Sequence, residues 1–233
     1  MARLSAIDTL IVDVPTIRPH VLAMATMHRQ SMVIVRLRDE DGVEGIGEGT
    51  TIGGMSYTNE SPESIKSVID TYIAPVLDIC DPAAVAATMA MIGRCVKGNH
   101  FAKCAVETAL LDMAGKRLGV PLSDLIGGGR LRASLPVAWT LASGDTARDI
   151  EEAEALLPRH VHGIFKLKIG KRDVDEDVKH VGAICRALGD RASVRVDVNQ
   201  NWTEAQAEPG IAMLHDVGVD LVDGPLHGDH VAA

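Results

Sequence analysis

The chain has 233 residues, of which 46% are hydrophobic and 24% charged, and its formal net charge is -9. No apolar run approaches the roughly 18 residues that a membrane span needs, and the acidic balance argues against nucleic acid or an anionic membrane as a partner. Asp8 and Asp13 interrupt the apolar N-terminal stretch, which therefore lacks the core of a signal peptide, and we expect a cytoplasmic protein.

The four cysteines are irregularly spaced and include no C-x-x-C pair. This spacing argues against a zinc site and against a disulfide framework. We expect all four to be reduced and to have ordinary structural roles.

The first half of the chain predicts strands followed by helices. Residues 8–14 and 31–49 read as strands, and Asp41-Gly42 is a hairpin turn between two apolar runs. Ser61 is a candidate N-cap, with Pro62 at the first helical position. Two further helices are expected, one from residue 81 to about Gly98 and one over 101–119.

After residue 130, strands alternate with helices. The expected strands are 134–141, 163–169, 193–198 and 219–222, and the expected helices are about 146–157, 174–188 and 203–215. Such alternation is typical of a parallel sheet built from βα units. We therefore place a domain boundary near residue 130. Pro209 and Gly210 lie inside the last expected helix, where a proline costs about 3 kcal/mol.

Two neighbouring strands of the second domain each carry a polar face. Alternate side chains of a strand share a face, so Lys166 and Lys168 lie on one side, and Asp197 and Asn199 do so on the next strand. An interior parallel strand is normally apolar on both faces. If the sheet closes into a barrel, these side chains line its interior at the active-site mouth. In an open sheet, they would simply be solvated.

This set of side chains suits metal-assisted proton transfer. Asp197 offers hard oxygen ligands for Mg²⁺ or Mn²⁺. Lys168, crowded by the Lys166 ammonium and by a metal ion, is expected to have a lowered pKa and to act as an acid/base. The metal ion would stabilise the enolate that forms when a proton moves α to a carboxylate. The pattern predicts Lys168 as the proton carrier and Lys166 as the neighbour that tunes it.

Longer stretches of the chain resemble a known family. The runs FKLKIG and VRVDVNQNW, together with 15-PTIRPHVLAM-24, 45-GIGEGTTIGG-54 and 102-AKCAVETALLDMAGKRLGVP-121, resemble the muconate lactonizing enzyme subgroup of the enolase superfamily. The resemblance extends over residues 5–207. It implies an α/β protein in which an α+β enolase-type capping domain (1–130) precedes a (β/α) barrel (131–233). It also implies a Mn²⁺ or Mg²⁺ ion and reversible cycloisomerisation of cis,cis-muconate to muconolactone in catechol breakdown.

The resemblance also implies roles for single residues. Lys168 matches the family's acid/base lysine, and Lys166 is its catalytic neighbour. Asp197 matches the first metal ligand, and Asn199 matches a substrate-side neighbour. The substrate, a small dicarboxylate, would be covered by two loops of the capping domain. Their predicted substrate-binding residues are Ile17, His20, Ile52 and Tyr57.

The likeness weakens over the last part of the chain. Asp223 stands where the family has a glutamate as second metal ligand, and Gly224 replaces the usual glutamine. A full barrel takes about 250 residues, whereas residues 131–233 suffice for about three βα units and a fourth strand. We expect a C-terminally truncated chain with an incomplete barrel.

Several functions stay open at this point. The chain is either a muconate cycloisomerase, which we expect to be a homo-oligomer, or a catalytically impaired remnant that acts only by self-association. Chloromuconate cycloisomerase and dipeptide epimerase are alternative activities within the subgroup. We favour muconate because the TIRPH and TIGG stretches resemble that branch. Trp139 is expected in the core, and Trp202 is expected to line the site.

Overall fold

A computed structural model describes residues 3–22, 26–159 and 162–228 of the chain. The chain forms two compact units. Unit 1 comprises Met1–Thr16 and Arg29–Ala133, and unit 2 comprises Ile17–His28 and Ser134–Ala233. Segment 17–28, which we expected in the first domain, thus belongs to unit 2. No helix within the described ranges is long and apolar enough to cross a membrane.

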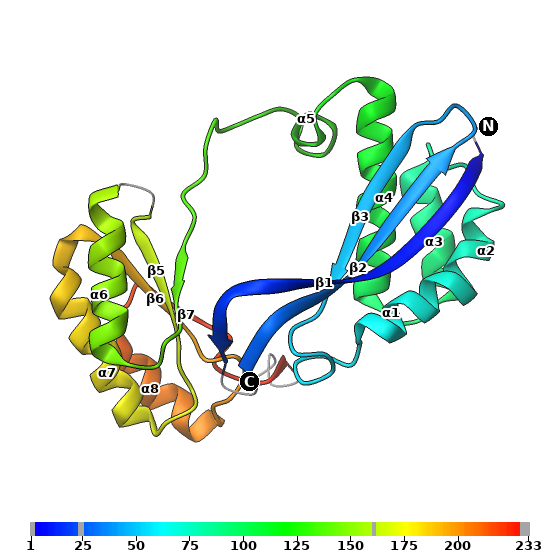
Figure 1. The fold of residues 1–233 in the computed structure, drawn as a ribbon. Coiled ribbons are helices and arrows are strands. Elements are labelled where there is room, and N and C mark those ends of the chain that lie inside the picture. Colours follow the sequence, from blue (N-terminus) through cyan, green and yellow to red (C-terminus); the bar gives the residue numbers. More distant parts are fainter. Residues whose placement is uncertain (1–2, 23–25, 160–161, 229–233) are drawn as a thin grey trace. The chain divides into compact units, whose positions relative to one another are not determined.

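Unit 1 contains a three-stranded sheet with its helices on one side (Figure 1). The strands β1 (Leu4–Val21), β2 (Thr26–Asp39) and β3 (Glu44–Thr50) follow chain order in the sheet, and β2 pairs antiparallel with β3. The predicted hairpin turn is confirmed, with Gly42 at a φ of 81° that favours glycine. The helical segments are α1 (Pro62–Val68), a π turn (Ile69–Ile73), α2 (Ala74–Leu77), α3 (Val85–Cys95), α4 (His100–Leu118) and α5 (Leu122–Gly127).

The core of unit 1 forms where α4 lies directly on β3. Every second residue of β3 is a glycine, and these glycines face the helix. A Cβ atom added to Gly47 would lie 1.9 Å from the carbonyl oxygen of Ala105. Only glycine therefore permits this approach of backbone to backbone. The predicted start of α1 is also confirmed, since the Ser61 hydroxyl accepts a hydrogen bond from the Ser64 backbone and Pro62 is the first helical residue.

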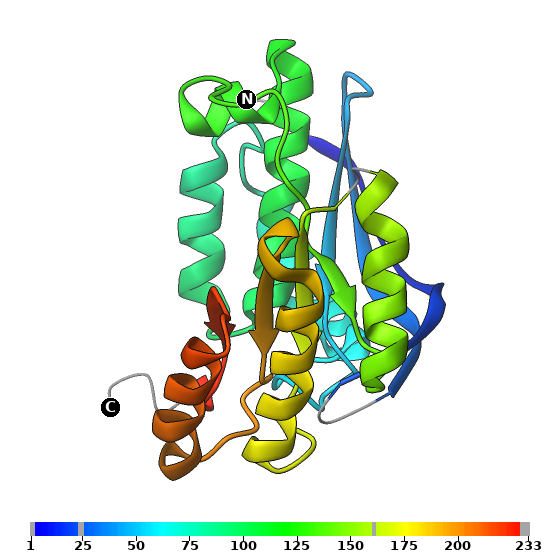
Figure 2. The ribbon, with the colours of Figure 1, turned by 90° about the vertical axis from the view of Figure 1, so that its left-hand side faces the viewer.

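Unit 2 contains a four-stranded parallel sheet in chain order. Its strands are β4 (Trp139–Leu141), β5 (Ile164–Lys168), β6 (Ser193–Asp197) and β7 (Leu221–Asp223). The connecting helices α6 (Thr146–Leu156), α7 (Val174–Leu188) and α8 (Glu204–Asp216) lie side by side in front of the sheet in Figure 2. Short 3₁₀ turns follow α6 and α7, at Leu157–Arg159 and Gly189–Arg191. The expected α/β fold with an incomplete (β/α) barrel is confirmed.

The two central strands of unit 2 bury their apolar faces under these helices. Phe165 and Leu167 of β5 are fully buried, and Val194 and Val196 of β6 are at most 3% exposed. The polar side chains alternate with them and therefore point to the opposite side of the sheet. The sequence-based assignment of strand faces is confirmed, and the polar face is the one that carries the candidate site.

The last expected helix, over residues 203–215, is confirmed as α8 in spite of the proline inside it. α8 continues through Pro209, and the apolar side chains of Ala207 and Leu214 bury into the core on either side of it. This burial offsets the backbone hydrogen bond that proline cannot donate. Gly210 makes room for the ring of Trp202, because a Cβ atom there would lie 2.7 Å from the ring. Trp202 is a core residue, 5% exposed, contrary to the expectation that it lines the site.

Candidate active site

The candidate site lies at the carboxyl ends of β5, β6 and β7. Strand pairing places Lys168 opposite Asp197, and Asp197 opposite Asp223. Because the three strands are parallel, their ends meet at one edge of the sheet, which is where active sites form in barrels of this kind. The sheet thus aligns one ammonium and two carboxylates across neighbouring strands.

Asp197 is the centre of a four-residue ionic cluster. Its Oδ2 accepts a hydrogen bond from Lys168 Nζ at 2.7 Å and lies 2.9 Å from Lys166 Nζ. Lys166 Nζ also donates to Asp223 Oδ2 at 2.6 Å. The side chain of Asp197 is 8% exposed, that of Lys168 12% and that of Lys166 26%. The two lysines therefore share one buried carboxylate.

The loop after β6 fixes the other carboxylate oxygen of Asp197. Asp197 Oδ1 accepts a hydrogen bond from the backbone N–H of Asn199 at 2.9 Å. Asn199 and Gln200 both have left-handed backbone angles, with φ of 53° and 64°, and such angles cost energy in residues other than glycine. Asn199 is 5% exposed, and no described residue donates a hydrogen bond to its Oδ1.

The charges of the cluster shift its pKa values. Burial raises the pKa of Asp197, but the hydrogen bonds and charges of Lys168 and Lys166 outweigh burial and hold that pKa below its ordinary value. Burial lowers the pKa of Lys166, but its bonds to Asp223 and Asp197 outweigh burial and raise that pKa. Lys166 is therefore firmly charged here and supplies the second ammonium that we expected beside Lys168.

The carboxylates of Asp197 and Asp223 suit a hard divalent cation in type. They are adjacent across two strands, and both present oxygen atoms that are now held by ammonium groups. No group of three or more His, Cys, Asp or Glu side chains within the described residues forms a set that could hold a metal ion. The two aspartates thus fit as part of a ligand set, and a bound cation would have to displace an ammonium from Asp197.

The predicted loop residues fall in both units. His20, on β1, is partly buried in unit 2, and burial first, then the charges of Lys168 and Arg18, lower its pKa. The neighbouring Val21 and Leu22 line a cavity of about 50 Å³ together with Lys168. Ile17 is 86% exposed and is not brought to the cluster. Ile52 and Tyr57 lie in unit 1, between β3 and α1, and their role stays a prediction.

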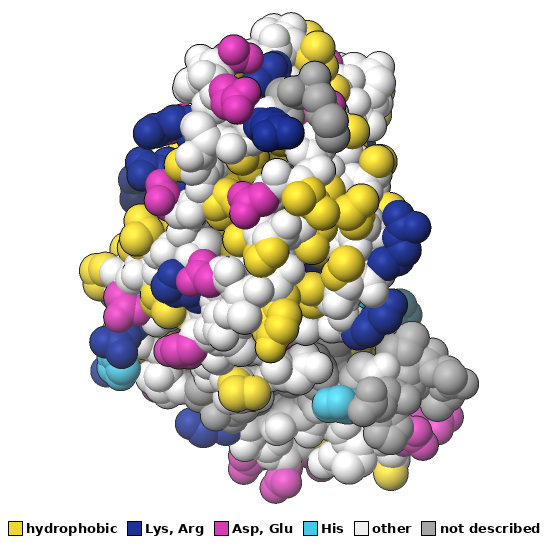
Figure 3. All heavy atoms as spheres, turned by 90° about the vertical axis from the view of Figure 1, so that its right-hand side faces the viewer, with side chains coloured by type: hydrophobic (Ala, Val, Ile, Leu, Met, Phe, Trp, Pro, Cys, Tyr) yellow, Lys and Arg dark blue, Asp and Glu magenta, His cyan; other side chains and the backbone are white. Residues whose placement is uncertain are grey.

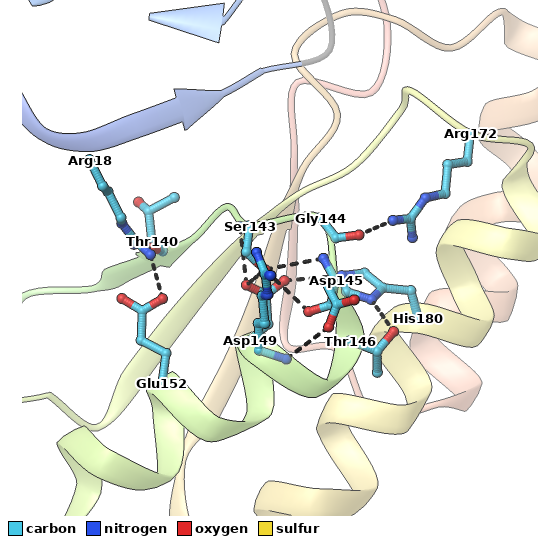
Figure 4. Close-up of polar contacts among 11 residues, drawn as sticks. Arg18, Thr140, Ser143, Gly144, Asp145, Thr146, Asp149, Glu152, Arg172 and His180 are labelled. Atoms are coloured by element: carbon cyan, nitrogen blue, oxygen red, sulfur yellow. Dashed lines mark hydrogen bonds and ion pairs between the residues drawn. The ribbon is translucent and has the colours of Figure 1, made fainter. Parts of the chain in front are cut away.

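Sequence reasoning missed a buried polar cluster beside this cavity. Figure 4 shows Ser143, Thr146, Asp149 and His180 together, joining the start of α6 to α7. The Ser143 hydroxyl donates to Asp149 at 2.6 Å, and Thr146 Oγ1 lies 2.7 Å from His180 Nδ1. His180 also lines the cavity. The available signal was weak: one aspartate and one histidine sit on the apolar faces of two predicted helices.

Comparison with known proteins defines the class. Residues 6–127 match the N-terminal domain of mandelate racemase / muconate lactonizing enzyme, and residues 148–233 match the enolase C-terminal domain-like family. Together with the fold, these matches identify an enolase superfamily protein. Within that superfamily, the chain belongs to the mandelate racemase / muconate lactonizing enzyme family. Enzymes of this family act on small molecules and use a divalent metal ion.

Several relatives are muconate cycloisomerases. The chain is 56% identical to muconate cycloisomerase 1 of Pseudomonas putida over 94% of its own length, and 54% identical to muconate cycloisomerase 1-1 of Acinetobacter lwoffii over 94%. It is 46% identical to the chloromuconate cycloisomerase of Delftia acidovorans over 96%. The muconate lactonizing enzyme from Pseudomonas fluorescens complexed with muconolactone superposes with a TM-score of 0.95 at 55% identity, covering 99% of this chain and 62% of that one.

The length of the match is limited on the relatives' side. The chain spans 58–60% of the length of these curated relatives.

Proposed function

We propose that this chain carries the proton-transfer half of a muconate cycloisomerase, which interconverts cis,cis-muconate and muconolactone in catechol breakdown. The observation that carries the proposal is the convergence of Lys166 and Lys168 on Asp197, beside Asp223, at the strand ends of an enolase-type sheet. Identity of 52–56% to muconate cycloisomerases, against 44–46% to chloromuconate cycloisomerases, favours muconate over its chlorinated analogue.

In the proposed reaction, a carboxylate oxygen of muconate adds to a conjugated double bond, and the electrons move toward the other carboxylate to give an enolate. Lys168, as an ammonium, then delivers a proton to the α-carbon, and in the reverse direction its free amine removes that proton. Lys166 stays charged, holds Asp197 in place and attracts the substrate carboxylate. A Mn²⁺ or Mg²⁺ ion held in part by Asp197 and Asp223 would supply positive charge that stabilises the enolate.

The remaining predicted residues take substrate-binding roles in this proposal. Asn199, in the loop after Asp197, and His20, whose pKa the charge of Lys168 helps to lower, would contact polar groups of the substrate. Ile52 and Tyr57 keep their predicted role of covering its apolar carbon chain, whereas the exposed Ile17 is given no role at the cluster.

We further infer a cytoplasmic homo-oligomer. All four cysteines are free thiols, which is typical of a reducing compartment. Hydrophobic side chains gather on the face of unit 1 that Figure 3 shows. In the sheet of unit 1, Leu10 is 56% exposed and Ile46 50% exposed. Exposed apolar side chains of this kind support contacts between copies of a chain.

Turnover of cis,cis-muconate by the purified chain tests the proposal. The loss of the ultraviolet absorbance of muconate is followed with Mn²⁺, with Mg²⁺ and with a chelator, and chloromuconate is offered in parallel. We expect metal-dependent turnover that Lys168→Ala abolishes and that the matched control Lys179→Ala, an exposed lysine on α7, leaves unchanged.

Absence of turnover would contradict the proposal. A folded chain that does not turn over muconate with either metal would overturn the claim that these residues suffice for the reaction, and would favour the remnant that acts only by self-association. Preference for chloromuconate would assign the chain to that related activity.

A further inference from the structure

The end of β1 alternates between exposed and partly buried side chains over residues 17–20 in unit 2. Ile17 is 86% exposed, Arg18 and His20 are partly buried, and Leu22 is 3% exposed. Successive side chains of a strand point to opposite sides. Arg18 and His20 therefore face the rest of unit 2 together, and Ile17 and Pro19 face away from it.

Arg18 clamps this strand to β4 and α6. Its guanidinium forms an ion pair with Glu152 and donates a hydrogen bond to the Thr140 carbonyl oxygen at 2.7 Å. Figure 4 shows Arg18 reaching from β1 down to these two groups. The guanidinium also lies 5.7 Å from the centre of the Trp139 ring, and the Trp139 indole donates to Glu152 at 2.8 Å. Glu152 thus receives bonds from both side chains and is itself held in place.

We propose that Arg18 is a positioning residue, whose clamp on Glu152 and on the Thr140 carbonyl holds His20 beside Lys168. The inference rests on the proposed function, because Lys168 is the proton carrier there. Two residues along a strand span about 7 Å, so an anchor at Arg18 fixes where the imidazole of His20 can lie. The planar guanidinium holds its donors in a fixed geometry, whereas the ammonium of a lysine is a single charged group on a flexible stem and would not fix the strand in the same place.

The clamp has a chemical consequence for His20. Burial, then the charges of Lys168 and Arg18, lower the pKa of His20, so its imidazole is neutral at pH 7. A neutral imidazole has one donor and one acceptor nitrogen. Held next to Lys168, it can bind a substrate group without adding another positive charge to a cluster that already has two ammonium groups.

Histidine titration by NMR tests the clamp without requiring activity. The pKa of His20, assigned with a His20→Gln variant, is measured in the metal-free chain for the wild type, Arg18→Lys, Lys168→Met and the double variant. Arg18→Lys keeps the positive charge but removes the planar guanidinium with its several N–H donors. We expect the pKa of His20 to rise toward about 6.5 in Arg18→Lys. Lys168→Met should raise that pKa in the wild-type background but leave it unchanged in the Arg18→Lys background.

A matched control is an arginine that pairs with another glutamate of α6. Arg191, in the 3₁₀ turn after α7, pairs with Glu154 of α6, and its side-chain bonds found within the described residues go to Glu154, Ala187 and Leu188 and not to β1. Arg191→Lys should leave the His20 titration unchanged. An unaltered pKa of His20 in Arg18→Lys, or an equal shift in Arg191→Lys, would overturn the inference.

The kinetic constants of Arg18→Lys provide a second test of the positioning role. If the chain turns over muconate, Arg18→Lys should raise KM about tenfold or more while kcat falls less, because the variant misplaces a binding group and leaves Lys168 in place. A chain without turnover contradicts the proposed function but leaves the titration result standing. An Arg18→Lys variant that loses kcat alone would contradict the positioning role.

Discussion

The two sheets of the molecule support their helices in different ways. In unit 1, β3 presents glycines to α4, and backbone touches backbone. In unit 2, β5 and β6 present Phe165, Leu167 and valines to their helices, and a layer of side chains fills the space between. A glycine contact tolerates almost no added volume, whereas a side-chain layer leaves the other face of the sheet free to carry polar groups. Unit 1 is thus specified mainly by packing, and unit 2 has room for chemistry.

The largest effect is expected from a substitution that disrupts the contact between the glycines of β3 and α4 in unit 1. In Gly47→Ala, the new Cβ atom would lie 1.9 Å from the Ala105 carbonyl oxygen and 2.6 Å from the Thr108 hydroxyl. Because the obstacle is backbone, α4 must move away from the sheet, and we expect a loss of about 3 kcal/mol or more in the free energy of unfolding. Urea denaturation followed by circular dichroism measures this loss.

The control substitution adds the same methyl group where there is space. Gly93, inside α3, has no atom within 4 Å of the position that a Cβ atom would take. Gly93→Ala should stabilise the chain by about 0.5–1 kcal/mol, because alanine favours helices. Equal stability of Gly47→Ala and wild type would contradict the tight contact.

The second largest effect is expected from a substitution that disrupts the ionic cluster on the polar face of unit 2. Asp197→Asn removes the carboxylate that Lys166 and Lys168 share, and we expect a loss of about 2 kcal/mol at pH 7, because two partly buried ammonium groups remain with Asp223. The pKa of Asp197 in the folded chain lies below its ordinary value. Its stabilisation is therefore complete above the ordinary pKa and disappears as the pH falls through the folded one.

Unfolding of metal-free samples at pH 7 and near pH 3 tests this dependence. The difference between wild type and Asp197→Asn should narrow at the lower pH. Asp190→Asn, an exposed change in the same unit, should show no difference at either pH. A constant gap between wild type and Asp197→Asn at both pH values would mean that packing, and not charge, explains the loss.

A smaller effect is expected at the first turn of α4, where a buried charge in unit 1 caps the helix. Asn99, the N-cap residue, makes no side-chain cap bond, and instead the buried carboxylate of Glu60 accepts from the backbone N–H groups of Phe101 and Ala102 at 3.1 and 3.2 Å. Glu60→Gln keeps an oxygen acceptor but removes the charge that suits a helix N-terminus, and we expect a loss of about 1 kcal/mol in chemical denaturation. An unchanged midpoint would show that the charge contributes nothing.

Much of unit 2 could be predicted from the sequence, because the alternation that defines the faces of a strand involves only neighbouring residues. Period-two alternation alone placed Lys166, Lys168, Asp197 and Asn199 on one face. It could not reveal that Lys166 would hold Asp223, because that bond joins strands 57 residues apart. Arg18 was missed for the same reason, since its partner Glu152 is 134 residues away.

Local rules also leave out the contribution of packing. A proline is unfavourable inside a helix, yet burial of neighbouring apolar side chains keeps α8 continuous through Pro209. In unit 1, the glycines of β3 were visible in the sequence, but their partner helix was not. Alternating glycines show that something approaches the strand closely and cannot say what.

The smallest expected effect concerns Asp177, which is 3% exposed in unit 2. Its Oδ2 accepts a hydrogen bond from the backbone N–H of Gly170 at 2.7 Å, just beyond Lys168. Burial raises the pKa of Asp177, so its charged form is unfavourable in the folded chain at neutral pH, and this cost disappears as the pH falls through the raised pKa. Asp177→Asn keeps the acceptor without the charge. We expect it to unfold within about 0.5 kcal/mol of wild type at pH 7, on the stabilising side, and to match wild type near pH 3. Clear destabilisation at pH 7 would instead mean that the nearby Arg172 and His180 make the charge of Asp177 favourable.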